Sequence, residues 1–192
     1  ELLHVLRTAD VSRVIAEFPA EALQEAAATA GATITDMQSL PGSAPAFQLP
    51  EVDPGRRAMI VFTSGTTSKP KGSVATHANL VAMMSGMEQA WGWRADDCIP
   101  LFLPLHHVHG IVNVLGCALW AGACVEPFNG FSQDAILQRV EDGAYYVFMA
   151  VPTIYVKLIT ALEAMSAPRR DALCSAFGRM RLMVSGSAAL PA

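Results

Sequence analysis

The sequence predicts an α/β fold with layered, largely parallel sheets flanked by helices. Short apolar runs of strand-like composition alternate along the chain with longer runs of helical composition, an order that is typical of parallel sheets. The overall composition agrees, because 52% of the 192 residues are hydrophobic and only 16% are charged. A chain this apolar is expected to bury its strands on both faces.

Residues 1–50 are expected to be the end of a first α/β subdomain followed by a linker. The predicted elements are a helical face at 2–6, a strand at 13–17, a helix at 20–30 capped by Gly31, and a strand at 33–37. Prolines and glycines crowd residues 41–55, and this composition indicates a surface linker.

Residues 51–192 are expected to form a second α/β subdomain. Its predicted strands are 59–62, 99–103, 123–126, 145–151 and 182–184. Its predicted helices are 79–91, 111–120, a helix capped by Ser132 that runs to Val140, and a helix opened by Pro152.

Charge and cysteine content exclude several classes of protein. The formal net charge is −4 and the chain has no basic run, which argues against nucleic-acid binding. No apolar run is long enough to span a membrane. The four cysteines form no C-x-x-C pair, so we expect buried, reduced thiols in a cytoplasmic or organelle-matrix protein rather than a secreted one.

A hydroxyl- and glycine-rich loop follows the strand at 59–62. The loop contains Thr63, Ser64, Gly65, Thr66, Thr67, Ser68, Lys71 and Gly72. Five hydroxyls can donate to phosphate oxygens, the glycines allow close backbone approach, and the lysine supplies a compact positive charge. The spacing is not that of a Walker A loop. A solvated turn would have a similar composition, but the ordered string of Ser-Gly-Thr-Thr and then Pro-Lys-Gly favours a polyphosphate site.

This loop resembles the phosphate-binding signature of adenylate-forming enzymes, the superfamily of acyl-CoA synthetases, firefly-type luciferases and nonribosomal adenylation domains. The resemblance implies that the loop closes over the phosphates of ATP during adenylation. One residue departs from the pattern, since Ser68 stands where the family usually has glycine.

A histidine cluster, Pro104-Leu105-His106-His107-Val108-His109-Gly110, follows the next predicted strand. Ligands of α/β sheets bind at the carboxyl ends of strands, so this position suits chemistry. The cluster also resembles the Pro-Leu-x-His-x-x-Gly segment of the same superfamily, which implies that His107 lies beside the acyl carboxylate and the α-phosphate. A zinc site at His107 and His109 is the alternative, although the neighbouring sequence offers no third ligand.

Two later segments complete the resemblance. Val151-Pro152-Thr153-Ile154-Tyr155 and Ser185-Gly186-Ser187-Ala188-Ala189-Leu190-Pro191 would be ordinary strand ends by themselves. In this order they resemble the acyl-pocket segments of malonyl-CoA synthetases, notably the mitochondrial type. The resemblance places Gly186 and Ser187 at the substrate. Lys157 occupies the place of an arginine that meets the distal carboxylate in bacterial relatives, with Arg181 as a more remote candidate. The plain alternatives are a surface lysine on a helix for Lys157 and a surface residue at a strand start for Arg181.

The resemblance implies an ATP-dependent carboxylate–CoA ligase that uses ATP, Mg²⁺ and CoA and acts on malonate or methylmalonate. It also implies that the chain is a fragment of the N-terminal domain, inactive alone, without the C-terminal domain that carries the adenylation lysine. Three alternatives stay open: a fatty acyl or aryl ligase, a zinc hydrolase, and a non-catalytic binding module.

Overall fold

The computed structural model describes residues 1–42, 48, 50–63 and 69–189 of the chain. It divides into two compact units, Glu1–Asn79 and Leu80–Ala192, which are taken in turn below. The subdomain boundary expected near residue 50 stays a prediction about the larger architecture.

The first unit begins with a small α/β layer, as predicted. Its elements are α1 (Leu2–Thr8), β1 (Arg13–Ala16), α2 (Glu21–Ala30), β2 (Thr33–Asp36) and the 3₁₀ turn η1 (Met37–Ser39). Strands β1 and β2 are parallel, with Val14 opposite Ile34. Gly31 ends α2 at φ 76°, a conformation in which glycine is favoured. Met37 leaves the predicted strand because the Asp36 carboxylate accepts a hydrogen bond from the Gln38 N–H and starts the turn.

The rest of the first unit contains an antiparallel hairpin that the sequence did not predict. Strands β3 (Arg57–Thr63) and β4 (Lys71–Thr76) pair with Thr63 opposite Lys71. Residues 63–72 were expected to form one loop, whereas both ends of that segment are strand. Gly72 suits the hairpin, since a Cβ atom there would lie 2.9 Å from the Ile60 side chain and would force it to shift.

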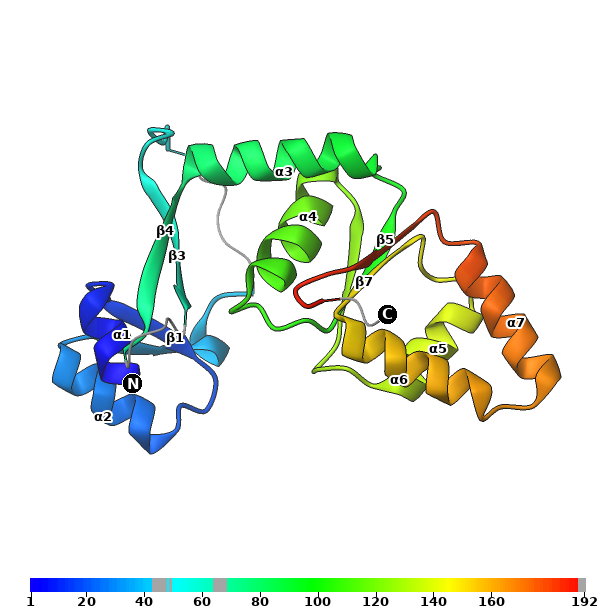
Figure 1. Ribbon diagram of the computed structural model, residues 1–192. Coiled ribbons are helices and arrows are strands. Elements are labelled where there is room, and N and C mark those ends of the chain that lie inside the picture. Colours follow the sequence, from blue (N-terminus) through cyan, green and yellow to red (C-terminus); the bar gives the residue numbers. More distant parts are fainter. Residues whose placement is uncertain (43–47, 49, 64–68, 190–192) are drawn as a thin grey trace. The chain divides into compact units, whose positions relative to one another are not determined.

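The second unit is a layered α/β structure, which confirms the predicted fold class (Figure 1). Its elements are α3 (His77–Trp91, which starts in the first unit), β5 (Cys98–Leu101), η2 (His109–Gly116), α4 (Cys117–Ala121), β6 (Cys124–Pro127), α5 (Gln133–Glu141), β7 (Val147–Ala150), α6 (Pro152–Glu163), α7 (Ala167–Gly178) and β8 (Leu182–Ser185). Strand β5 pairs in parallel with β6, and β7 with β8. The Tyr146 N–H donates to the Cys98 carbonyl at 3.2 Å, so β5 and β7 lie side by side.

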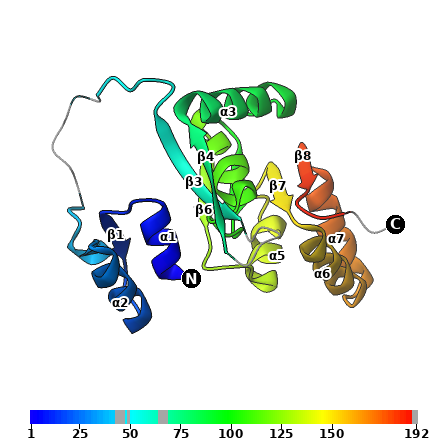
Figure 2. The same cartoon turned by 60° about the vertical axis from the view of Figure 1, so that its left-hand side comes forward.

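The core of the second unit is centred on β7. All four residues of this strand are fully buried. The Phe148 ring packs against the rings of Phe102, Tyr155 and Phe177 at centroid distances of 5.7–5.9 Å. Figure 2 shows α6 and α7 running beside β7 and β8. Within the described part of the chain, no helix is both long and apolar enough to cross a membrane.

The cysteines differ in part from expectation. All four are free, but only Cys117 is buried and Cys98 is half-buried. Cys124 and Cys174 are exposed, so the prediction of burial is wrong for these two. Cys124 lies on β6, which within the described residues pairs with β5 alone and therefore leaves one edge open.

Candidate functional site

The segments that follow β5, β7 and β8 meet at one cavity of about 360 Å³. Its lining residues are Leu103, Pro104, His107, Val108, His109, Gly110, Val151 and Ser187. The carboxyl ends of the three strands therefore lie at the same edge of the sheet, where α/β proteins bind ligands. The structure brings together the histidine cluster and the serine–glycine turn, each of which follows a strand.

The turn after β5 depends on Gly110. A Cβ atom at this position would overlap the Pro104 carbonyl oxygen and lie 3.0 Å from the Leu103 carbonyl oxygen. Only glycine allows the chain to fold back so closely on the end of β5. The backbone then continues as a π-helix, η2, where the sequence predicted an ordinary helix over 111–120. π-Helical turns are rare and often occur at functional sites.

His107 is exposed and lines the cavity. Its carbonyl oxygen accepts hydrogen bonds from the N–H groups of Gly110 and Ile111, both at 3.0 Å, so the start of η2 fixes its backbone. The neighbouring His106 ring lies 4.2 Å from the His107 ring but does not line the cavity. The role of His107 at the reacting carboxylate stays a prediction.

His109 is a buried member of the site that the sequence linked only to the zinc alternative. Its Nδ1 atom lies 3.0 Å from Ser187 Oγ, across 78 residues of sequence. Burial lowers the pKa of His109, so the ring is neutral near pH 7. Within the described ranges no three histidine, cysteine, aspartate or glutamate residues gather as a metal site.

The turn that carries Ser187 is held in place by β7 and α6. The Gly186 N–H donates to the Ala150 carbonyl at 3.2 Å, and the Tyr155 hydroxyl donates to the Val184 carbonyl at 2.9 Å. Burial raises the pKa of Tyr155 to about 12, which keeps this donor protonated. The two predicted acyl-pocket segments are thus adjacent. Gly186 holds the turn through its backbone N–H, and Ser187 lines the cavity.

Lys157 lies on α6 and is exposed. It follows Thr153 by four residues, so the two side chains lie on the same face of the helix. It is not among the residues that line the cavity. No ion-pair partner for Lys157 occurs within the described residues. Its contact with a substrate carboxylate stays a prediction.

The phosphate-loop residues fall partly outside the described structure. Thr63 ends β3 and Lys71 and Gly72 begin β4, whereas Ser64, Gly65, Thr66 and Thr67 lie outside the described residues. The Thr63 hydroxyl donates to the Lys71 carbonyl at 3.5 Å. Lys71 is exposed, and no described carboxylate pairs with it. A cation without an acidic partner at the end of a hairpin suits an anionic ligand.

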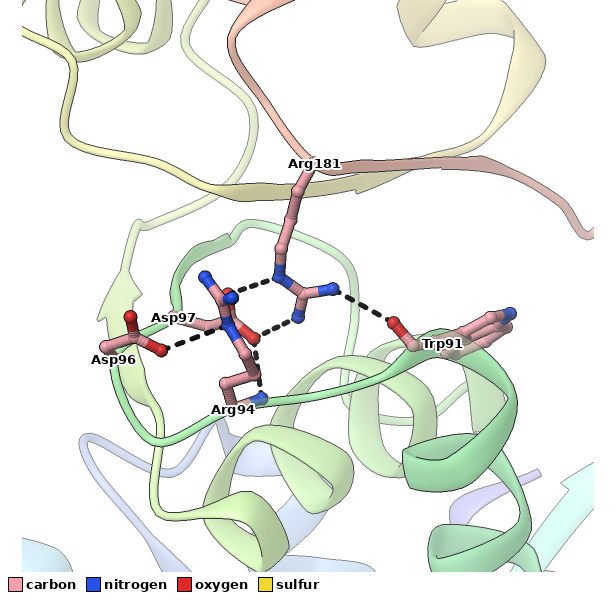
Figure 3. Close-up of polar contacts among 5 residues, drawn as sticks. All are labelled: Trp91, Arg94, Asp96, Asp97 and Arg181. Atoms are coloured by element: carbon pink, nitrogen blue, oxygen red, sulfur yellow. Dashed lines mark hydrogen bonds and ion pairs between the residues drawn. The ribbon is translucent and has the colours of Figure 1, made fainter.

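Arg181 has a structural role, which argues against the expectation that it is a second substrate cation (Figure 3). Its Nε donates to Asp97 Oδ1 at 2.7 Å, its Nη2 pairs with Asp97 Oδ2, and its Nη1 donates to the Trp91 carbonyl at 2.9 Å. The Asp97 side chain is 0% exposed. Burial raises the pKa of Asp97, but hydrogen bonds from Arg181 and the Arg94 N–H outweigh burial and hold the pKa below its usual value.

A model of the AMP-binding enzyme family matches residues 1–192. The chain belongs to the AMP-binding enzyme family. It is 46% identical over 142 residues to the mitochondrial malonate–CoA ligase of Homo sapiens, an alignment that covers 70% of this chain and 24% of that protein. It is also 35% identical over 213 residues to the malonate–CoA ligase of Arabidopsis thaliana, which covers 100% of this chain and 35% of that protein.

Solved structures of AMP-binding enzymes have the same fold. A malonyl-CoA ligase in a ternary product complex with methylmalonyl-CoA and AMP superposes with a TM-score of 0.82 at 35% identity, covering 100% of this chain and 39% of that chain. The ATP-bound MatB of Rhodopseudomonas palustris gives a TM-score of 0.79 at 29% identity, covering 98% of this chain and 37% of that chain. These findings confirm the resemblance to malonyl-CoA synthetases. This chain spans only about a quarter to two fifths of the length of these relatives.

Proposed function

We propose that the full-length protein to which this chain belongs is an ATP-dependent carboxylate–CoA ligase that acts on malonate or methylmalonate. The observation that carries the proposal is the cavity at the ends of β5, β7 and β8, where His107 and Ser187 lie together. The sequence segments that carry these side chains resemble those of adenylate-forming enzymes and follow one another in the same order. The relatives named as malonate–CoA ligases and the complex with methylmalonyl-CoA support the choice of acid.

The reaction has two steps, and the predicted site residues would serve the first. A carboxylate oxygen of the acid attacks the α-phosphorus of ATP, the bond to the β-phosphate oxygen breaks, and pyrophosphate leaves with that electron pair. CoA thiolate then attacks the acyl carbon and displaces AMP. The first step brings two anions together, so the protein mainly orients the reactants and neutralises charge.

Each predicted site residue has a role in this scheme. Thr63, Ser64, Gly65, Thr66, Thr67, Lys71 and Gly72 would hold the ATP phosphates, as hydroxyl donors, close-approach glycines and one cation. His107 would orient the reacting carboxylate from its position at the cavity. Gly186 and Ser187 would contact the acyl portion, and Lys157 would attract the distal carboxylate.

Magnesium would enter with the nucleotide. The described residues offer no cluster of three metal ligands. Mg²⁺ keeps most of its waters and binds mainly through substrate phosphates, so the nucleotide would supply most of its other ligands. When bound, the ion would neutralise negative charge on the phosphates. A mitochondrial or cytoplasmic location is part of the proposal, since the human relative is mitochondrial.

A panel of acids tests the proposal with the full-length protein, ATP, Mg²⁺ and CoA. Pyrophosphate release would report adenylation, and mass spectrometry would identify the thioester. We expect kcat/KM for malonate and methylmalonate to exceed that for butyrate, a monocarboxylate of similar bulk, by about ten-fold or more. Equal use of butyrate, or preference for fatty or aryl acids, would refute the substrate assignment. Absence of any thioester would refute the ligase itself.

A further inference from the structure

A buried histidine holds the one hydroxyl side chain that lines the cavity among the described residues. His109 is only 7% exposed, and its Nδ1 lies 3.0 Å from the Oγ of Ser187. The other ring nitrogen, Nε2, is buried without a hydrogen-bond partner in the described part of the chain. The ring is therefore fixed at one nitrogen and unpaired at the other.

This asymmetry indicates which nitrogen carries the proton. A neutral imidazole has one N–H donor and one acceptor nitrogen. If Nε2 were protonated, a buried N–H would have no acceptor. If Nδ1 is protonated, Nε2 is an unpaired acceptor, and among buried backbone groups under-satisfied acceptors are commoner than orphaned N–H groups. The pairing thus favours Nδ1–H donating to Ser187 Oγ.

The direction of this hydrogen bond sets what Ser187 can offer to a ligand. When Oγ accepts from His109, the hydroxyl proton of Ser187 is free to point to an acceptor in the cavity. Ser187 also adopts φ 68°, a left-handed conformation that is rare for residues other than glycine. Strained conformations of this kind persist where the surrounding structure holds them, often at functional sites. Here the backbone conformation and the histidine both restrict the position of the hydroxyl.

We infer that His109 is a positioning residue that makes Ser187 a hydrogen-bond donor to the distal carboxylate of the acid substrate. The inference rests on the proposed function, because it places Ser187 beside Lys157 as a second group that binds the distal carboxylate of that substrate. A carboxylate is an acceptor only, so it matches a hydroxyl whose oxygen is already occupied by His109. A methyl group at the same place, as in butyrate, gains nothing from the donor.

Two substitutions of similar size separate positioning from packing. In the full-length protein, His109→Asn puts an amide nitrogen near the former Nδ1 and can still donate to Ser187, whereas His109→Gln puts its amide nitrogen near the former Nε2 and cannot. We expect His109→Gln to lower kcat/KM for malonate about ten-fold or more, the effect of losing a hydrogen bond to a charged group. Butyrate should fall less than about three-fold, and His109→Asn should retain most of the malonate preference.

A double-variant cycle tests whether His109 acts through Ser187. Adding His109→Gln to Ser187→Ala should change the malonate preference less than about two-fold, because the hydroxyl that His109 orients is already gone. Independent, multiplicative losses would overturn the inference, as would equal losses for malonate and butyrate in His109→Gln. A wild-type protein that makes no malonyl-CoA would instead refute the proposed function, so the two failures are distinguishable.

The tautomer gives a test that is read on the wild-type protein, and variants serve only to assign the signals. Nitrogen-15 NMR of the histidine-labelled wild-type protein distinguishes protonated from unprotonated ring nitrogens, and signals absent from His109→Asn, or perturbed in Ser187→Ala, assign this ring. We expect a protonated Nδ1 and an unprotonated Nε2. The opposite tautomer would mean that Ser187 donates to His109 and is not the donor to the substrate, which overturns the inference.

Discussion

Replacing Asp97 by asparagine should destabilise the protein strongly, although Asp97 lies outside the candidate site. The Asp97 carboxylate accepts three hydrogen bonds, two from the Arg181 guanidinium and one from the Arg94 N–H at 2.8 Å. Asparagine keeps the shape and can retain the bond from Arg94. It removes the negative charge and one of the two acceptors that Arg181 needs.

The magnitude follows from the burial of each partner. Breaking a buried ion pair by removing one partner destabilises a protein by about 3–5 kcal/mol. The Arg181 side chain is 23% exposed, so water can partly solvate it after Asp97→Asn, and we expect about 2–4 kcal/mol. Arg181→Met leaves a fully buried carboxylate. The carboxylate can take up a proton, which limits the cost of its unpaired charge to about 4 kcal/mol at pH 7. This limit follows because the pKa of an ordinary aspartate lies about three units below pH 7, at 1.36 kcal/mol a unit.

Urea unfolding of the full-length protein measures these changes. Fluorescence of Trp93, which is buried in the same unit, reports the transition of interest. The control is Arg94→Ala, because that side chain forms only an exposed ion pair with Asp96 and should change stability by less than about 1 kcal/mol. The double variant Asp97→Asn/Arg181→Met should lose less than the sum of the single variants. A loss below about 1 kcal/mol for Asp97→Asn, or strict additivity, would refute this reasoning.

Four further outcomes are expected. Lys71→Ala should slow acyl-adenylate formation about a hundred-fold while weakening ATP binding far less, as single-turnover pyrophosphate release would show; an unchanged rate would contradict its role. Lys157→Met should lower kcat/KM for malonate by about ten- to hundred-fold but spare butyrate, and equal losses would make it a surface lysine. Gly110→Ala should destabilise the fold by about 1–3 kcal/mol in urea unfolding, because the new Cβ overlaps the Pro104 carbonyl. The stability difference between wild type and Asp97→Asn should shrink as the pH falls from about 5 towards 3, because the lowered pKa of Asp97 contributes stability only while the carboxylate is ionised; a constant difference would contradict this.

The α/β class could be predicted because it depends on local composition. Fully buried strands such as β7 have continuous apolar sequence, and Pro152 at the start of α6 marks a helix start directly. Helix α7 was missed although its signal is present, since Ser166 precedes it as N-cap with proline in the first turn. The sequence does not predict the β3–β4 hairpin, because its second strand, Lys71–Thr76, is polar and follows a hydroxyl-rich segment whose composition is typical of a loop.

The site was only partly predictable, because it depends on contacts between distant segments. The positions of His107 and Ser187 after strands follow from local sequence. The bond between His109 and Ser187 spans 78 residues, and no local pattern encodes it. The π-helix likewise depends on how closely Gly110 packs against Pro104. The sequence alone shows only that Arg181 is positively charged. The structure shows that the buried Asp97 already pairs with the Arg181 guanidinium.

The Asp97–Arg181 pair and the candidate site lie at opposite ends of β8. This strand has only four residues, Leu182–Ser185, and within the described residues it pairs with β7 alone. So short a ladder fixes its register weakly, yet a slip of one residue would move the following turn by about 3.3 Å and reverse the direction of every side chain. Such a shift exceeds what the 3.0 Å contact between Ser187 and His109 can tolerate. Arg181 directly precedes the strand and is held at three atoms by Asp97 and the Trp91 carbonyl. The ion pair therefore secures the register of β8 at its start, while the Tyr155–Val184 and Gly186–Ala150 hydrogen bonds secure it at its end, beside the Ser187 hydroxyl.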